Sequence, residues 1–469
     1  MRPKEFYAHV RSLVAAGNVD LALQVIQSYL RNGPEYDEFL HLAGRLATIR
    51  KQIRLGKISD TDATIAINQI QHVVLELVSM MEKKEAQADP RSLNEQLTRA
   101  IIEAIRPYCK PAQNFLKQAA AYPEWEREGR ISDKAKEIIA FSFVGVIGIQ
   151  LSKLMAIGKE EHSPDKPRKY LEKCLHIAKH SFSLVNFALL SQLWDAQRDH
   201  FRHLTENQKQ VIRKCFDTPF ELTLPERLQL LRVLHNIFSL PVHRLAFPIQ
   251  ELKGLDLSTE SELEFIATEL QGLNARLEDG SYNLLDCITA ERLLADFFRH
   301  FHFLANYRMA SIKRIGYQQL RFSEPAYLHR YTALGIDSKA NIDAEKVNYT
   351  TDTTHTDAVL LYQGEDYRNS INLSPFIIDY NALTFEHGAR ICFFQNTGPT
   401  DEILEYVFLE DNGSVRITFS GTLKPDADYN ELMLHKDTRQ ELNLDHVVQH
   451  LNECRRILLE ADQPNFDDL

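Results

Sequence analysis

Four amphipathic segments follow one another in the first 88 residues. Hydrophobic residues recur at helical spacing in each segment: Phe6, Val10, Leu13 and Val14; then Leu21, Val25 and Ile26; then Phe39, Leu42, Leu46, Ile49 and Ile53; then Ile67, Ile70, Val74, Leu77 and Met81. Gly17, Gly33 and Gly56 separate the segments, and Ser59 with Asp62 three residues later resembles a capping box. Because short loops favour antiparallel neighbours, residues 1–88 are predicted to form a helical bundle, followed by a linker at MEKKEAQADP.

The next region, residues 92–334, is also predicted to be helical. Strand-like alternation is scarce there, and prolines divide the region into helices of ordinary length. One apolar run, residues 139–158, is about long enough to cross a bilayer. Gln150 and Lys153 lie inside this run, and a charge is costly at membrane depth. We therefore expect a buried core helix and no membrane contact.

β-forming residues cluster after Gly335. Five segments are predicted strands: Ala358–Tyr362, Phe376–Tyr380, Arg390–Phe394, Leu404–Leu409 and Val415–Phe419. Asp411-Asn412-Gly413 indicates a hairpin between the last two. A final amphipathic helix carries Leu444, Val447, Val448, Leu451, Ile457 and Leu458 on one stripe. The sequence thus predicts a mainly α protein: an N-terminal bundle (1–88), a larger all-helical domain (92–334), and an α+β domain (335–469) with a small, mostly antiparallel sheet.

Charge is unevenly distributed along the chain. The net charge of the 469 residues is −11, whereas residues 335–469 contain 25 acidic and 10 basic side chains, a balance of −15 that leaves about +4 for the rest. Phosphate and anionic lipid both require basic surfaces, so the acidic C-terminal region argues against nucleic-acid or membrane partners there. The start MRPKEFYAHV lacks the apolar region of a signal peptide, and we expect a cytoplasmic protein.

The sequence indicates neither a metal nor another cofactor. The six cysteines form no CxxC pair and are interpreted as buried free thiols in a reducing cytosol, Cys392 among them. His300 and His302 are two residues apart, so on a helix they face away from each other and suit one metal poorly. Neither a phosphate-binding GxxxxGK[ST] loop nor a GxSxG nucleophile elbow occurs.

The first bundle resembles the bacterial effector-associated domains, Death-like helical modules of prokaryotic conflict systems. The resemblance covers residues 8–82 and is most specific at Leu55, Gly56, Ile58, Ser59, Asn68 and Ile70. It implies homotypic pairing between this domain and a matching domain on an effector, which in such systems is a protease, a TIR domain or an NTPase. The protein is therefore predicted to be a non-enzymatic adaptor, sensor or regulated component of a bacterial defence or signalling system.

Charged residues on the third helix are candidates for that pairing. Arg45, Arg50, Lys51 and Arg54 lie toward its end, and Glu35, Asp37 and Glu38 lie near its start. Complementary charged faces steer and align paired modules. The alternative is a solvated helix surface, with cations near the helix C-terminus where they are mildly favourable.

Two other functions remain open from the sequence. Arg198, Asp199 and His203 resemble the Rx4-6H motif of the all-helical HEPN ribonucleases, which implies that the Arg and His assist attack by an RNA 2′-hydroxyl. With 18 histidines in the chain, chance matches to so short a pattern are expected. Alternatively, the chain is a substrate or inhibitor of a partner protease, cut within residues 80–90 or 335–357.

Overall fold

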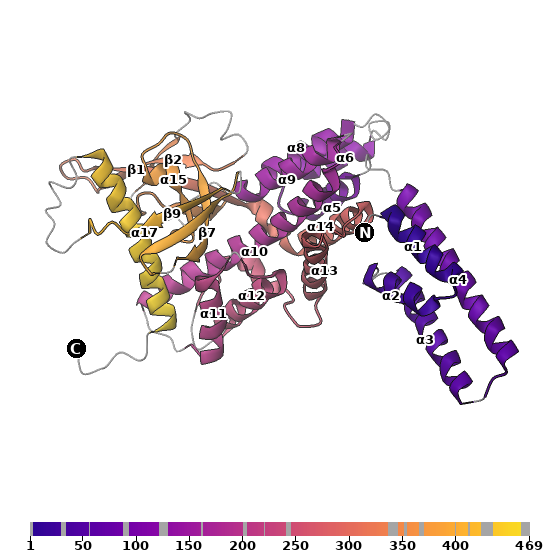
Figure 1. Ribbon diagram of the computed structural model, residues 1–469. Helices are drawn as coiled ribbons and strands as arrows, with labels where there is room; N and C mark the ends of the chain where they lie inside the picture. Colours follow the sequence, from indigo (N-terminus) through magenta and orange to yellow (C-terminus); the bar gives the residue numbers. More distant parts are fainter. Residues whose placement is uncertain are drawn as a thin grey trace.

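The computed structural model describes most of the chain. The described residues are 3–29, 34–55, 57–87, 93–121, 130–160, 163–199, 204–219, 221–240, 245–335, 346–350, 354–364, 370–398, 400–410, 413–423 and 435–460. Figure 1 shows an N-terminal group of helices, a larger helical region, and a C-terminal region that contains two sheets.

The N-terminal bundle has the four helices that the hydrophobic spacing predicts. They are α1 (Pro3–Ala15), α2 (Val19–Tyr29), α3 (Pro34–Arg54) and α4 (Asp60–Gln87). Gly17 separates α1 from α2 with a φ of 76°, a conformation that favours glycine. The Asp62 amide donates to Ser59 Oγ at 3.1 Å, which confirms the cap at the start of α4. Buried hydrophobic residues from all four helices form a core of their own.

Two details of the bundle differ from the prediction. Leu21 is 50% exposed rather than buried, because α2 instead turns Ala22, Leu23 and Ile26 inward. The predicted linker is helical over its first part, since α4 continues to Gln87. Glu, Lys, Ala and Gln after Met81 are good helix formers, so this polar segment extends the helix rather than ending it.

The larger helical region is arranged around one long central helix. Its elements are α5 (Glu95–Ile105), α6 (Lys110–Ala121), α8 (Arg130–Ser142), α9 (Gly145–Lys159), α10 (Lys166–Asp199), α11 (Glu206–Asp217), α12 (Leu224–Ser239), η3 (Gln250–Gly254), α13 (Glu262–Glu278), α14 (Leu284–Phe301) and η4 (His302–Asn306). Helix α10 contacts α9, α12, α13, α14 and α17. Its residues between Tyr170 and Leu193 are mostly buried, as expected of a core helix.

The apolar run 139–158 is largely buried, with Phe141 44% exposed, but it forms parts of two helices rather than one. Helix α8 ends at Ser142 and α9 begins at Gly145. Between them, the Val144 amide leaves the helical pattern and donates to Leu304 O at 3.2 Å. A Cβ on Gly148 would lie 2.3 Å from Ala140 O, so glycine permits the close packing of α9 on α8. Among the described helices, none combines the length and apolarity that a membrane span requires.

The C-terminal region contains two antiparallel sheets. The first has the order β3-β2-β1-β4-β5 and comprises β1 (Tyr307–Gln318), β2 (Ala326–Ala333), β3 (Lys346–Thr350), β4 (Val359–Gln363) and β5 (Ile371–Asn372). The second has the order β6-β7-β8-β9 and comprises β6 (Ile377–Asp379), β7 (Ile391–Thr397), β8 (Ile403–Phe408) and β9 (Ser414–Thr418). The remaining helices are α15 (Tyr380–Leu383) and α17 (Lys436–Leu459). All five predicted strands and the final helix are confirmed.

The β-region begins at Tyr307, within the segment predicted to be all-helical. Strands β1 and β2 were missed because their sequences do not alternate. In β1, Met309, Ala310, Ser311 and Ile312 are buried on both faces, whereas the later residues are largely polar and exposed. Likewise β3 lies in the segment 335–357 that was interpreted as a cleavable linker.

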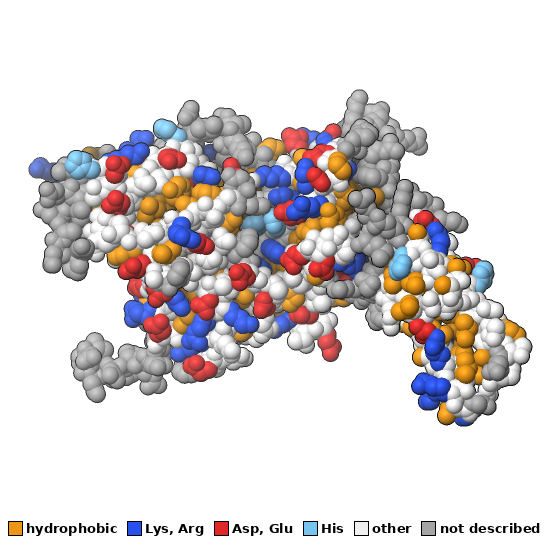
Figure 2. Space-filling model, in the orientation of Figure 1, with side chains coloured by type: hydrophobic (Ala, Val, Ile, Leu, Met, Phe, Trp, Pro, Cys, Tyr) orange, Lys and Arg blue, Asp and Glu red, His pale blue; other side chains and the backbone are white. Residues whose placement is uncertain are grey.

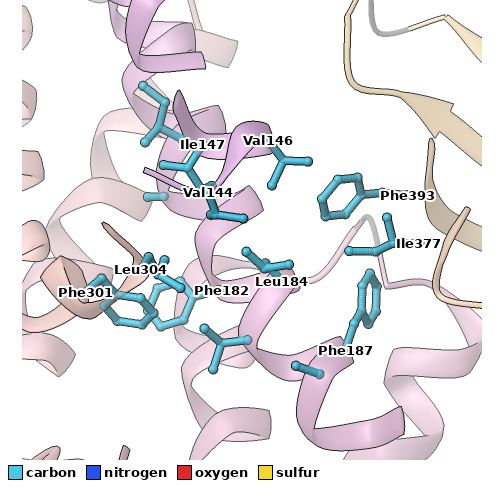
Figure 3. Close-up of a cluster of buried hydrophobic side chains, with 14 of the residues drawn as sticks. Val144, Val146, Ile147, Phe182, Leu184, Phe187, Phe301, Leu304, Ile377 and Phe393 are labelled. Atoms are coloured by element: carbon cyan, nitrogen blue, oxygen red, sulfur yellow. The ribbon is translucent and has the colours of Figure 1, made fainter. Parts of the chain in front are cut away.

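One hydrophobic core extends from Leu93 to Leu459 and joins the helical region to the sheets. Figure 3 shows Phe187 of α10 facing Ile377 and Phe393 of the second sheet. The rings of Phe187 and Phe376 are stacked with centroids 5.2 Å apart. The domain boundary at residue 335 stays a prediction. Buried side chains from the helices before it and from the strands after it pack together in this one core.

Candidate functional site

The basic residues of α3 do not all lie on one face. With about 100° between successive residues of an α-helix, Arg45 and Arg54 are on opposite sides. Arg50, Lys51 and Arg54 lie within roughly 100° of one another. All four side chains are exposed. The helix therefore brings Arg50, Lys51 and Arg54 together, and we call these three the basic end of α3; it does not bring Arg45 to them.

Arg50 has a partner within the bundle. Its guanidinium donates to the Asp20 carboxylate of α2, which ties α2 to α3. The side chains are 52% and 46% exposed, so the ion pair stabilises the bundle by at most about 1 kcal/mol. Replacing Lys51 and Arg54 leaves this ion pair in place, whereas a replacement of Arg50 breaks it.

For the acidic candidates, the structure describes the helix but not the side chains. Glu35, Asp37 and Glu38 belong to the first turns of α3, and their side chains lie outside the described residues. Figure 2 shows Lys and Arg side chains along the α3 edge of the bundle, beside a strip of hydrophobic side chains.

Exposed hydrophobic side chains adjoin the basic end of α3. Leu55, which follows Arg54, is 57% exposed. Among the side chains of the bundle that the structure describes, the other large exposed hydrophobic residues are Leu21, Leu40, Ile65 and Met80. Sequence reasoning missed Leu55 as a surface residue. The signal was its spacing, because Leu55 lies two residues after Ile53 and is thus rotated by about 200° from the buried stripe. Protein interfaces typically have an apolar centre surrounded by a polar rim.

Comparison with protein families decides the identity of this bundle. Residues 5–82 match the family model of effector-associated domain 11. The match spans the four helices and confirms the resemblance seen in the sequence, and the remainder of the chain has no recognised family. Searches of curated proteins and of solved structures gave no match.

The effector-associated domain has a core separate from that of residues 93–459. Among its described residues, Arg50 forms an ion pair with Asp20, and Arg11 of α1 forms one with Glu82 of α4. Domains typically have a hydrophobic core of their own, and the four helices of residues 3–87 share such a core.

The ribonuclease-like motif begins in the last turn of α10. Arg198 is exposed in the last turn, the side chain of Asp199 lies outside the described residues, and so does His203. A different histidine is near Arg198. Burial lowers the pKa of His450 on α17, and the charges of His446, His355 and Arg198 act in the same direction. Nothing in the sequence indicates that Arg198 and His450 lie near each other, because α10 and α17 are far apart in the chain.

The two histidines considered as metal ligands, His300 and His302, have different partners. His300 Nε2 lies 3.1 Å from Glu262 Oε2, whereas His302 Nδ1 lies 2.6 Å from Arg299 O. No group of three or more His, Cys, Asp or Glu side chains suited to a metal occurs among the residues described. Cys392 is buried on β7, and all six cysteines are buried free thiols, as predicted.

Proposed function

We propose that the chain is a non-enzymatic adaptor or sensor component that docks a partner effector through its effector-associated domain. The match of residues 5–82 to that family carries the proposal. As the family resemblance implies, the partner would have a matching domain, fused to a protease, a TIR domain or an NTPase. Residues 93–459 would then hold the trigger or a second partner, in a bacterial defence or signalling system.

The basic end of α3 is the proposed contact surface for an acidic face of the partner domain. Lys51 and Arg54 supply positive charge, and exposed Leu55 supplies apolar area beside it. Opposed charges of this kind raise the association rate and fix the register of two modules, and salt screens them over about 8–10 Å. The affinity is therefore expected to fall as ionic strength rises.

Capture by the full chain tests the docking proposal. The variant Lys51→Glu/Arg54→Glu is expected to weaken capture at least tenfold, because like charges opposed across an interface cost several kcal/mol. The control is Lys110→Glu/Lys117→Glu, which reverses two exposed charges on α6. Retained proteins from the native host are identified by mass spectrometry, and the supporting result is a protein with its own effector-associated domain.

Equal loss in the α6 control would show a nonspecific charge effect and contradict the assignment of the surface. If circular dichroism shows that the wild-type chain is folded but it retains no protein with an effector-associated domain, the docking proposal is contradicted. A separate variant, Arg45→Glu, determines whether the opposite flank of α3 also contributes.

RNA cleavage is a second candidate function, favoured by His450 of α17, which lies near Arg198 and whose pKa is lowered by burial. If it holds, Arg198→Ala and His203→Ala each lower the rate of RNA cleavage by about 100-fold or more, as expected for loss of a charge-stabilising or proton-transferring group. Cleavage by purified wild-type chain is measured on labelled RNA. No cleavage, or cleavage unchanged in both variants, would exclude this function.

A further inference from the structure

A small cavity lies where the helical region meets the second sheet. Its volume is about 80 Å³. Helix α10 contributes His176, Lys179, His180 and Ser183, α12 contributes Arg227, and β7 closes it with Phe393. Figure 3 shows Phe187 and Phe393 at this junction. Thus basic and polar side chains from two helices meet the apolar face of a sheet.

The two cations of this cavity are held at fixed positions. Arg227 is 5% exposed, and its Nε donates to Leu222 O at 3.0 Å and its Nη1 to Ser183 Oγ at 2.5 Å. Lys179 Nζ donates to Asn274 Oδ1 at 3.2 Å. Burial lowers the pKa of Arg227 to about 10 and lowers that of Lys179, and mutual repulsion with Arg227 adds to the effect on Lys179. With a pKa of about 10, Arg227 remains charged at neutral pH.

Acidic groups stand outside the cavity. Glu278 attracts Lys179 and accepts from Asn274 Nδ2 at 2.6 Å, and Glu226 is occupied at the cap of α12 with Thr223. Among the lining residues that the structure describes, none is a carboxylate. The cavity therefore has a positive potential in a low-dielectric setting, where attraction to an anion is strong.

The two histidines are neutral donors or acceptors at pH 7. Burial, together with the neighbouring basic residues, lowers the pKa of His176 to about 4 and that of His180 to about 3. His180 Nδ1 lies 2.7 Å from His176 O. The buried His176 Nδ1 has no hydrogen-bond partner. An unsatisfied buried ring nitrogen costs free energy, and a bound group that accepts its hydrogen would remove that cost.

We propose that this cavity binds a tetrahedral oxyanion, either free phosphate or the terminal group of a phosphate monoester. A cavity of about 80 Å³ has room for a group the size of two or three waters at about 30 Å³ each. Drug-sized ligands need roughly 300 Å³ or more, so only a small anionic group fits inside. Lysine and arginine match the charge and the acceptor oxygens of phosphate. This site is independent of the proposed docking function.

Calorimetric titration of the full chain with inorganic phosphate tests the proposal. We expect saturable binding to one site, and Lys179→Gln is expected to weaken it about tenfold or more because it removes a charge-assisted hydrogen bond. His176→Phe keeps the ring shape but removes the nitrogens, so it should also weaken binding while the fold persists. The control Lys214→Gln removes an equal charge from α11, where the side chain is 59% exposed, and should bind as wild type does.

Titration with glycerol phosphate distinguishes the source of the anion. Binding as tight as that of phosphate assigns the cavity to the terminal group of a monoester, and binding of phosphate alone assigns it to the free ion. No saturable binding of either by wild-type chain at millimolar concentration would overturn the proposal. Equal weakening by Lys179→Gln and Lys214→Gln would also overturn it.

Discussion

Replacing Glu291 by alanine is expected to lower the free energy of unfolding by about 4 kcal/mol. Glu291 on α14 is 4% exposed and accepts the backbone amides of Asn94 at 3.0 Å and Leu97 at 3.1 Å. The N-cap residue Asn94 makes no side-chain cap of its own, so this carboxylate caps α5 from another helix. Without it, two buried donors lose their acceptor at about 1–3 kcal/mol each, and a cavity remains.

Thermal unfolding followed by circular dichroism measures the effect of Glu291→Ala, with a midpoint expected several degrees below that of wild type. The Tyr170 hydroxyl loses less, because Asn94 Oδ1 at 2.9 Å is an alternative acceptor to Glu291. Glu291→Gln keeps one acceptor oxygen and should have an intermediate midpoint. The exposed Glu103 on α5 serves as control, and its change to alanine should leave the midpoint within a degree or two. Equal midpoints for the Glu291→Ala and Glu103→Ala variants would refute the capping role.

Gly145→Ala is expected to destabilise the fold by about 3 kcal/mol or more. A Cβ at this position would lie 1.8 Å from Leu334 O and 2.6 Å from Leu334 C. These are backbone atoms at the end of β2, and the Leu334 amide is itself bonded to Met309 O at 2.9 Å. Backbone atoms held in a sheet move less easily than the end of a flexible side chain. The added methyl group would therefore push the start of α9 away from the sheet.

Gly272→Ala is the matched control for this steric argument. Gly272 lies within α13, and a Cβ there meets no atom within 4 Å. Alanine favours a helix over glycine by up to about 1 kcal/mol, so this variant should unfold at the same or a slightly higher temperature. Urea titration of both variants gives the comparison. A Gly145→Ala chain as stable as Gly272→Ala would show that α9 and β2 do not approach as closely as described.

Local signals explain which parts of the fold the sequence predicts. The helices of the effector-associated domain repeat apolar residues at helical spacing, and Ser59 caps α4 as its own neighbours indicate. Strands β8 and β9 flank a hairpin signal and pair as expected, Val407 opposite Ser414. Each of these features depends on residues that are close together in the sequence.

Features formed by distant residues gave no such signal. Glu291 accepts from the N-cap residue Asn94, which lies 197 residues earlier in the chain, and the cavity combines α10 with α12 and β7. The start of strand β1 is buried because η4, α15 and the neighbouring strands β2 and β4 pack around it. On α3, by contrast, the helical period alone separates Arg45 from Arg54, so that division was available in the sequence.

A charge swap tests most directly whether the basic end of α3 docks a matching domain. Calorimetry measures the affinity of the full chain for the partner's effector-associated domain. The wild-type chain and Lys51→Glu/Arg54→Glu are each titrated with the wild-type partner. Each is also titrated with a partner whose facing acidic residues are changed to lysine. The account predicts that each reversal alone weakens binding at least tenfold and that the two together restore most of the affinity. Wild-type affinity for Lys51→Glu/Arg54→Glu with the wild-type partner would contradict it.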